Sequence, residues 1–188
     1  FHDARGSRVT IFLRAVEDPR PYGLVACAPD GRILAFREKP TSLEGLTTNT
    51  INAGIYLIDA ALLTRILSDR PASIEREFFP AVVADGTPCF GWLGEAYWRD
   101  IGTPVAYRDA QHDLLDGRVR TTLAPPGDEK AGSWLAEGVR VDDGARVEAP
   151  SVIGPAVVLE AGARVGPRAV VGARCHIGAG ARREGAPA

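Results

Sequence analysis

The chain has 188 residues, of which 45% are hydrophobic and 24% charged, and its formal net charge is −2 at pH 7. This composition is typical of a soluble globular protein, and the length allows one large domain or two modest ones. The small negative charge gives no basic field for nucleic acid or an anionic membrane. No apolar run approaches the roughly 20 residues of a membrane helix, and nothing at the start resembles a signal peptide. We therefore expect a cytoplasmic protein with neither a nucleic-acid nor a membrane partner.

Two residue types add to this description. Methionine is absent, even at position 1, so we expect the chain to be a fragment whose N-terminal portion is missing. The three cysteines, Cys27, Cys89 and Cys175, are far apart and odd in number. That arrangement favours reduced thiols over a disulfide framework.

The first hundred residues contain four predicted strands. A β-branched and aromatic run predicts a central strand over 9–15. A second strand is predicted over 23–28, and Asp30-Gly31 is typical of a hairpin turn that leads into a third over 33–38. The apolar run over 53–58 predicts another buried strand.

Helices are predicted between and after these strands. A polar loop over 41–50 precedes the fourth strand, and Asp59 can cap a helix that continues to Leu67. Ser73 can cap a second helix, which we expect to stop at Gly86. Thr103-Pro104 is typical of the start of a third helix, which we expect to reach about Leu115. Strands interleaved with helices indicate an α/β domain.

After residue 133 the pattern changes to a repeat of six residues. The repeat places an aliphatic residue at every sixth position: Leu135, Val141, Val147, Ile153, Leu159, Val165, Val171 and Ile177. A small or short residue follows each of them by four positions. A six-residue period fits neither a helix nor a simple hairpin; it predicts a triangular prism in which each hexapeptide forms one face and three form one coil. The pattern resembles the left-handed parallel β-helix of hexapeptide-repeat proteins.

Four motifs in the first part match, in order, those of sugar-1-phosphate nucleotidyltransferases. They are Tyr22-Gly23, FREKP at 36–40, NAGIY at 52–56 and WRDIGTP at 98–104. The intervening segment SIEREFFP at 73–80 is especially similar to mannose-1-phosphate guanylyltransferases. The resemblance covers about residues 1–117. It implies a Rossmann-like domain with a mixed sheet, and an enzyme that joins an NTP to a sugar 1-phosphate and releases pyrophosphate.

The resemblance also implies roles for individual residues. Lys39 would hold the sugar phosphate, because both reactants are anions whose charge must be neutralised. Glu38 and Asn52 would bind sugar hydroxyls, and the backbone of Gly23 would approach the sugar closely. Asp100 would be one carboxylate ligand of Mg²⁺. The neighbouring motif residues complete the predicted substrate site: Tyr22 and Gly54.

Two parts of this family's catalytic apparatus are not found in the sequence. The family's domain opens with a glycine-rich loop that cradles the nucleotide phosphates, and it uses an earlier aspartate as the other metal ligand. Neither precedes Phe1. The string GAGAR at 178–182 imitates the loop, but it is in register with the hexapeptides. We therefore expect activity only in the complete protein; GDP-mannose from mannose 1-phosphate is the favoured product, and glucose 1-phosphate is the next candidate substrate.

These observations predict the domain organisation. Residues 1–120 would be the C-terminal, sugar-binding part of a nucleotidyltransferase domain, 121–133 a linker, 134–182 the left-handed β-helix and 183–188 a tail. The repeats would end at about Ala181 without an obvious capping helix, which would leave an open edge and an apolar end. We expect a homo-oligomer that forms through the β-helix.

Two alternatives belong to other functional classes. A non-catalytic regulatory or scaffold paralogue would keep the fold and bind a sugar nucleotide. A hexapeptide acyltransferase would use a histidine on the β-helix as a general base. For the latter, His176 is the candidate, although its position favours a solvent-facing corner, and Cys175 occupies a small-residue position of the repeat.

Overall fold

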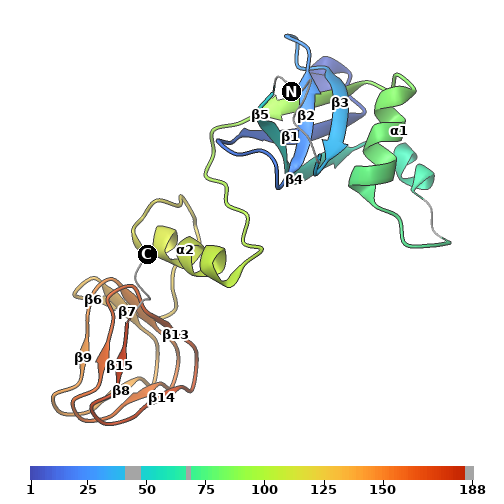
Figure 1. Cartoon of the computed structure of the whole chain (residues 1–188). Coiled ribbons are helices and arrows are strands. Elements are labelled where there is room, and N and C mark those ends of the chain that lie inside the picture. Colours follow the sequence, from blue (N-terminus) through green and yellow to red (C-terminus); the bar gives the residue numbers. More distant parts are fainter. Residues whose placement is uncertain (41–47, 67–68, 185–188) are drawn as a thin grey trace. The chain divides into compact units, whose positions relative to one another are not determined.

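The computed structural model describes residues 1–40, 48–66 and 69–184, in two compact units, Phe1–Trp98 and Arg99–Ala188. Figure 1 colours the first from blue to green and the second from green to red. Most of the predicted loop at 41–50, the last residue of the predicted helix at 59–67 and most of the predicted tail at 183–188 lie outside the described residues. The domain boundaries proposed from the sequence stay predictions.

The first unit is built on a mixed five-stranded sheet in the order β3-β2-β4-β1-β5. Its strands are β1 (Val9–Ala15), β2 (Gly23–Cys27), β3 (Ile33–Glu38), β4 (Thr50–Ile58) and β5 (Cys89–Leu93). β1 pairs antiparallel with β4 and parallel with β5, whereas β2 pairs antiparallel with both β3 and β4. The predicted interior position of the first strand and the hairpin from β2 to β3 are confirmed (Figure 1).

Two details of this sheet differ from the sequence prediction. Strand β4 begins at Thr50 rather than Ala53, and it is not buried on both faces, because Ile55 and Leu57 are 60% and 57% exposed. Strand β5 was not predicted at all. Its five-residue apolar run is too short to define a period, and a glycine in its middle weakens strand propensity. Pairing with β1, about 80 residues earlier, makes it a strand.

The predicted helix after Asp59 is shorter and tighter than expected. A 3₁₀-helix, η2, covers Ala60–Arg65, and the Asp59 carboxylate accepts a hydrogen bond from the backbone N–H of Ala61. Ile66 is already extended. Leu62 is the one buried residue of the helix, so no apolar stripe supports a longer α-helix.

The helix after Ser73 begins with a π-helical turn. Ser73 caps η3 (Ile74–Phe78), which continues directly into α1 (Phe79–Ala84). The backbone N–H of Phe79 donates to the carbonyl of Ile74, five residues earlier, which is the π-helical pattern. The next residue, Pro80, has no N–H and cannot donate a helical hydrogen bond. The Phe79 side chain is fully buried and its ring packs against three aromatic side chains: Phe36, Tyr56 and Phe78.

The second unit begins at Arg99, within the WRDIGTP segment, and continues into helix α2 (Pro104–Leu115). The bounds of α2 agree with the sequence prediction. The hydroxyl of Thr103 accepts from the N–H of Ala106, and Gly117 follows the helix in the left-handed region. A short strand within the predicted linker, β6 (Asp128–Lys130), pairs antiparallel with the first strand of the repeat region. No helix in the described ranges has the length and apolar character needed to cross a membrane.

The repeat region forms a parallel β-helix with three sheets, in which strands 18 residues apart stack in register. Figure 1 shows the stacked coils. Its strands are β7 (Ser133–Leu135), β8 (Arg140–Val141), β9 (Arg146–Val147), β10 (Ser151–Ile153), β11 (Val158–Leu159), β12 (Arg164–Val165), β13 (Val170–Val171), β14 (His176–Ile177) and β15 (Arg182–Arg183). Each of the eight predicted aliphatic positions ends a strand, so the predicted period and register are confirmed.

The corners of the prism recur with the same period. Every sixth residue adopts a positive φ, apart from Pro150; the residues are Gly138, Gly144, Ala156, Gly162, Arg168, Arg174 and Gly180. Inside the prism, Ile153, Leu159 and Val165 are fully buried. The repeat continues one strand beyond its predicted end, since β15 places Arg183 where earlier hexapeptides have an aliphatic residue.

A charge inside the prism should unfold neighbouring coils. We expect Val165→Asp to lower the free energy of unfolding of the second unit by about 3 kcal/mol or more, because an unpaired carboxylate would replace a fully buried side chain. Val158→Asp, on the outward position of β11, should cost less than about 1 kcal/mol. Urea denaturation followed by circular dichroism and hydrogen exchange measures both. Equal losses would contradict the inward assignment of Val165.

Candidate functional site

Four of the predicted site residues meet at the open end of the β2–β3 hairpin. Gly23 lies directly across from Glu38, and the N–H of Lys39 donates to the carbonyl of Tyr22 at 3.2 Å. A Cβ on Gly23 would lie 2.6 Å from Oε2 of Glu38 and 3.2 Å from the Phe36 ring. A side chain at residue 23 would therefore displace the Glu38 carboxylate from its present position. This is a different reason for glycine from the predicted close approach of sugar to backbone.

Strand β4 carries two more predicted site residues in a bulge. Its register with β1 shifts between Ile11, which faces Tyr56, and Leu13, which faces Asn52. Gly54 lies in the bulge at φ 80°. The side-chain oxygen of Asn52 accepts from the N–H of Gly54 at 2.9 Å, and its amide nitrogen donates to the Tyr56 hydroxyl at 2.8 Å. The Asn52 side chain is thus held in one orientation by its own strand.

Trp98 is a functional candidate to which the sequence interpretation gave no role of its own. Its indole N–H donates to the carbonyl of Ala53 in the bulge at 2.9 Å, and its ring meets the Tyr22 ring edge-on, with centroids 5.7 Å apart. Trp98 therefore joins the hairpin and the bulge. The signal for it was the first letter of the WRDIGTP motif.

The carboxylates near this cluster influence one another. Burial, and then the negative charge of Glu75, raise the pKa of Glu38, while Lys39 and Arg76 act in the opposite direction. Burial also raises the pKa of Tyr56, although its hydrogen bond with Asn52 opposes the shift. Glu75, in the SIEREFFP segment, is a second residue that sequence reasoning had not assigned to the site. Its charge reaches both Glu38 and Tyr56.

The last predicted site residue, Asp100, belongs to the second unit. Its carboxylate is exposed, and Oδ1 accepts from the N–H of Gly102 at 3.0 Å in a local turn. The structure therefore brings together six of the seven predicted residues in the first unit, and it describes Asp100 as part of a different unit.

The residue before Asp100 is held by a buried carboxylate of helix α2. Asp113 is 3% exposed, and its Oδ2 accepts from Nε and Nη2 of Arg99 at 3.0 and 2.7 Å. Its Oδ1 accepts from Arg118 at 2.8 Å. A buried charge needs such partners, so this network sets the path of the chain next to Asp100.

Comparisons with known proteins identify the family. The sequence model of the family described as nucleotidyl transferase matches residues 1–117, more than half of the chain. The chain belongs to the nucleotidyl transferase family. A second model, for the bacterial transferase hexapeptide with six repeats, matches residues 150–182.

Several curated relatives are named for the same activity. "Mannose-1-phosphate guanylyltransferase" of Mycobacterium tuberculosis (strain ATCC 25618 / H37Rv) is 36% identical over 155 residues, which are 82% of this chain and 42% of that protein. "Mannose-1-phosphate guanylyltransferase 1" of Arabidopsis thaliana is 33% identical over 160 residues, 85% of this chain and 42% of the relative. "Mannose-1-phosphate guanyltransferase" of Schizosaccharomyces pombe is 41% identical over 109 residues, which are 57% of this chain and 29% of that protein. The chain thus spans about two fifths of the length of the first of these relatives.

Members of the nucleotidyl transferase family generally use a divalent metal. Within the described ranges no group of three or more His, Cys, Asp or Glu side chains is placed to hold a metal ion. Mg²⁺ is often bound by only one or two protein carboxylates, while substrate phosphates and water supply the other ligands. Asp100 is an exposed carboxylate of this kind. The donor chemistry of Asp100 therefore fits one ligand of Mg²⁺.

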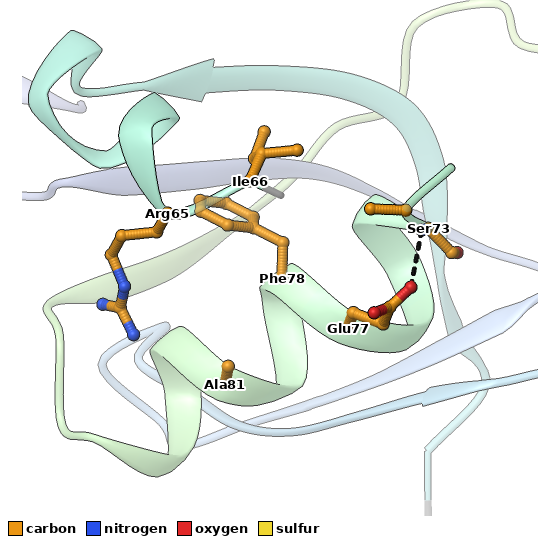
Figure 2. A pocket seen from close by; sticks show the side chains of 7 residues that line it. Arg65, Ile66, Ser73, Glu77, Phe78 and Ala81 are labelled. Carbon is orange, nitrogen blue, oxygen red and sulfur yellow. Dashed lines mark hydrogen bonds between the residues drawn. The ribbon is translucent and has the colours of Figure 1, made fainter. Parts of the chain in front are cut away.

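A pocket of about 230 Å³ in the first unit lies away from this cluster (Figure 2). It is lined by η3, α1 and the end of η2, and none of the predicted site residues contributes to it. The Glu77 carboxylate at its rim accepts from the N–H of Ser73 at 3.0 Å and pairs with Arg70. These bonds cap the helix, and they account for the polar wall of the pocket.

The histidine considered for an acyltransferase is engaged in an exposed pair. Nε2 of His176 lies 2.8 Å from Oε1 of Glu160 on the outer surface of the β-helix. The other Glu160 oxygen accepts from the N–H of Ala179. Cys175 is exposed as well. The solvent-facing position predicted for His176 agrees with this exposure.

The electrostatic coupling of Glu38 to Glu75 and Arg76 can be tested by titration. Glu75→Gln should lower the pKa of Glu38, because it removes the negative charge that opposes ionisation. Arg76→Gln should raise it, because a stabilising positive charge is lost. Carbon-detected NMR of the Glu38 carboxyl group measures both variants against wild type.

The sign of the accompanying pH dependence follows from the raised pKa of Glu38. The folded state holds this proton more tightly than the unfolded chain, so the contribution to stability is present below the unfolded pKa. It is lost as the pH rises through the folded pKa. Glu75→Gln should reduce that loss. Identical titration curves in Glu75→Gln and wild type would show that Glu75 does not act on Glu38.

Proposed function

We propose that the protein carrying this chain transfers a nucleotidyl group from an NTP to a sugar 1-phosphate and releases pyrophosphate. The favoured product is GDP-mannose, formed from mannose 1-phosphate. The observation that carries the proposal is the cluster at the hairpin and the bulge. There an exposed Lys39, a partly buried Glu38 and a fixed Asn52 are gathered beside two aromatic rings. Family membership and the guanylyltransferase relatives support the same reaction.

The reaction requires the enzyme to position the two substrates and to neutralise their negative charge, and it requires no covalent bond to the enzyme. A phosphate oxygen of the sugar phosphate attacks the α-phosphorus of the NTP, and the bond to pyrophosphate breaks. The Lys39 ammonium would hold the sugar phosphate as a compact positive charge. Glu38 would accept hydrogen bonds from sugar hydroxyls, and its raised pKa reflects the desolvated position such a role needs. Asn52 keeps one amide N–H beyond the one used by Tyr56, which a hydroxyl could accept.

Tyr22, Gly23 and Gly54 would shape the sugar site rather than react. Tyr22 would form one wall with Trp98, and Gly23 would leave space for the Glu38 carboxylate. Asp100 would supply a carboxylate to Mg²⁺, which when bound lowers the negative charge shared by the two phosphate groups. For the repeat region, we propose the left-handed form of the β-helix, as in the proteins that its hexapeptides resemble.

The site assignment is tested in a protein that carries the whole nucleotidyl transferase domain. Lys39→Ala should lower kcat/KM for the sugar 1-phosphate by roughly 30- to 1,000-fold, since a desolvated charge-assisted contact is worth about 2–4 kcal/mol. Lys130→Ala, the same change on strand β6 of the second unit, should leave steady-state kinetics unchanged. Asp100→Asn should instead raise the Mg²⁺ concentration required for half-maximal rate. Wild-type kinetics in both site variants would refute the assignment.

We also propose that the β-helix joins copies of the protein into a homo-oligomer. Its interior is filled by aliphatic side chains, which leaves no room for a substrate, and its last strand, β15, is an edge of its sheet. Covering that edge with another subunit would remove the open end.

Truncation after Gly132 should therefore lower the oligomeric mass more than turnover per active site. Light scattering and a steady-state assay on the same preparation measure the two effects. A truncated protein that keeps its mass but loses turnover would show that the β-helix contributes to the active site instead.

A further inference from the structure

A second cavity, of about 300 Å³, lies in the second unit between helix α2 and the last coil of the β-helix. We call it the basic pocket. Its polar walls are formed by seven residues: Tyr107, Arg108, Gln111, His112, Arg168, Arg183 and Glu184. The first four come from α2 and the others from the β-helix and the residue that follows β15. None of them is among the predicted site residues.

Two of the three arginines are fixed by carboxylates behind the cavity. Nη2 of Arg108 donates to Asp109 at 3.0 Å, and Nε of Arg168 donates to Asp116 at 3.0 Å. Each guanidinium has five N–H donors, so such a pairing leaves other donors for a ligand. The carboxylates hold the two guanidinium groups in place and thereby reduce the entropy that a ligand would have to remove.

Arg183 occupies a position that the repeat reserves for an aliphatic residue. It pairs in register with Val165, and Val165 in turn with Val147, both aliphatic residues at the same slot in earlier coils. Within the described ranges, Nη1 of Arg183 donates to the backbone carbonyl of Glu184 at 3.5 Å. The break in the repeat therefore places a positive charge in the wall of the pocket.

The lining of the pocket carries excess positive charge in a chain whose net charge is −2. Three arginines, Arg108, Arg168 and Arg183, and one carboxylate, Glu184, line the cavity. Two further carboxylates, Asp109 and Asp116, pair with Arg108 and Arg168 from outside the lining. Within the lining, the three arginines and one carboxylate differ by two positive charges. The Tyr107 hydroxyl and the Gln111 amide add neutral donors to the wall.

We propose that the basic pocket binds the phosphate group of a small phosphorylated molecule. Guanidinium groups from two elements can grip phosphate oxygens bidentately, which a single surface arginine cannot do. The cavity is larger than a bare phosphate requires, and Ala169 and Val170 line it on an apolar side. A phosphate ester therefore fits better than the free ion. Its binding would bridge α2 and the β-helix and stabilise the second unit by mass action.

The test uses the 188-residue chain and two probes, glycerol 3-phosphate and inorganic phosphate, at constant ionic strength. Calorimetry should show saturable binding with one site, and glycerol 3-phosphate should bind more tightly than inorganic phosphate. NMR should show shifts at the Nε–Hε groups of Arg108 and Arg168. Absence of saturable binding at millimolar concentrations of both probes would overturn the proposal, and equal affinities would overturn its claim for an ester.

Adjacent residues supply a matched control. Arg183→Gln should weaken glycerol 3-phosphate binding about tenfold, which corresponds to about 1.4 kcal/mol. Arg182→Gln should change it less than twofold, because Arg182 stacks on Arg164 in the outward position of β15. Equal weakening in both variants would show a diffuse charge effect in place of a site.

A second pair of variants guards against a folding defect in the last coil. Arg108→Gln, on α2, should weaken binding about as much as Arg183→Gln. Arg174→Gln, at the β-helix corner six residues after Arg168, should not. All four variants should keep the wild-type circular dichroism spectrum and Tm without ligand. Wild-type affinity in both Arg108→Gln and Arg183→Gln would locate the binding outside the basic pocket. Because these readouts involve no nucleotidyl transfer, their outcome is independent of the proposed reaction.

Discussion

The hydrogen bond from the Trp98 indole to the carbonyl of Ala53 links the two parts of the candidate sugar site, the bulge and, through the Tyr22 ring, the β2–β3 hairpin. The bulge in β4 takes this carbonyl out of the regular ladder with β1, and a buried carbonyl without a donor would be costly. The donor comes from the last residue of the first unit, 45 positions after Ala53, so a distant part of the chain satisfies this carbonyl. The bulge in turn fixes Asn52, and the Trp98 ring supports Tyr22 beside the β2–β3 hairpin.

In the second unit, a network of ion pairs links the β-helix, helix α2 and Arg99. Arg168, on a corner of the β-helix, pairs with Asp116 at the end of α2, and Arg118 joins Asp116 to the buried Asp113. Asp113 then holds Arg99, the neighbour of Asp100. The pairs form a continuous network from the repeat to the predicted metal ligand. The β-helix is thus physically connected to the segment on which the proposed chemistry relies, in addition to its proposed part in assembly.

Sequence patterns predicted the hexapeptide repeat and helix α2 correctly. The hexapeptide period, its aliphatic register and the bounds of α2 were predicted correctly, because each leaves a direct signal in the sequence: a repeated aliphatic position for the coils, and a capping Thr-Pro pair and a final glycine for the helix. The sequence predictions of secondary structure failed where packing or pairing with other parts of the chain decides the conformation. Strand β5 exists because β1 pairs with it, and the helix after Asp59 is a short 3₁₀-helix because it buries little apolar surface. Arg183 extends the repeat by pairing with Val165, although its own side chain breaks the pattern.

For the candidate site, the sequence by itself determined which residues to propose, and six of these motif residues lie at the hairpin and the bulge of the first unit. It could not determine how they are held. The space that Gly23 leaves for Glu38, the influence of Glu75 on that carboxylate and the donor that Trp98 gives to the bulge all join residues at least 15 positions apart. Such contacts depend on the pairing of strands and the packing of η3 against β3. Only the tertiary structure decides them, because burial and distance set the strength of each interaction.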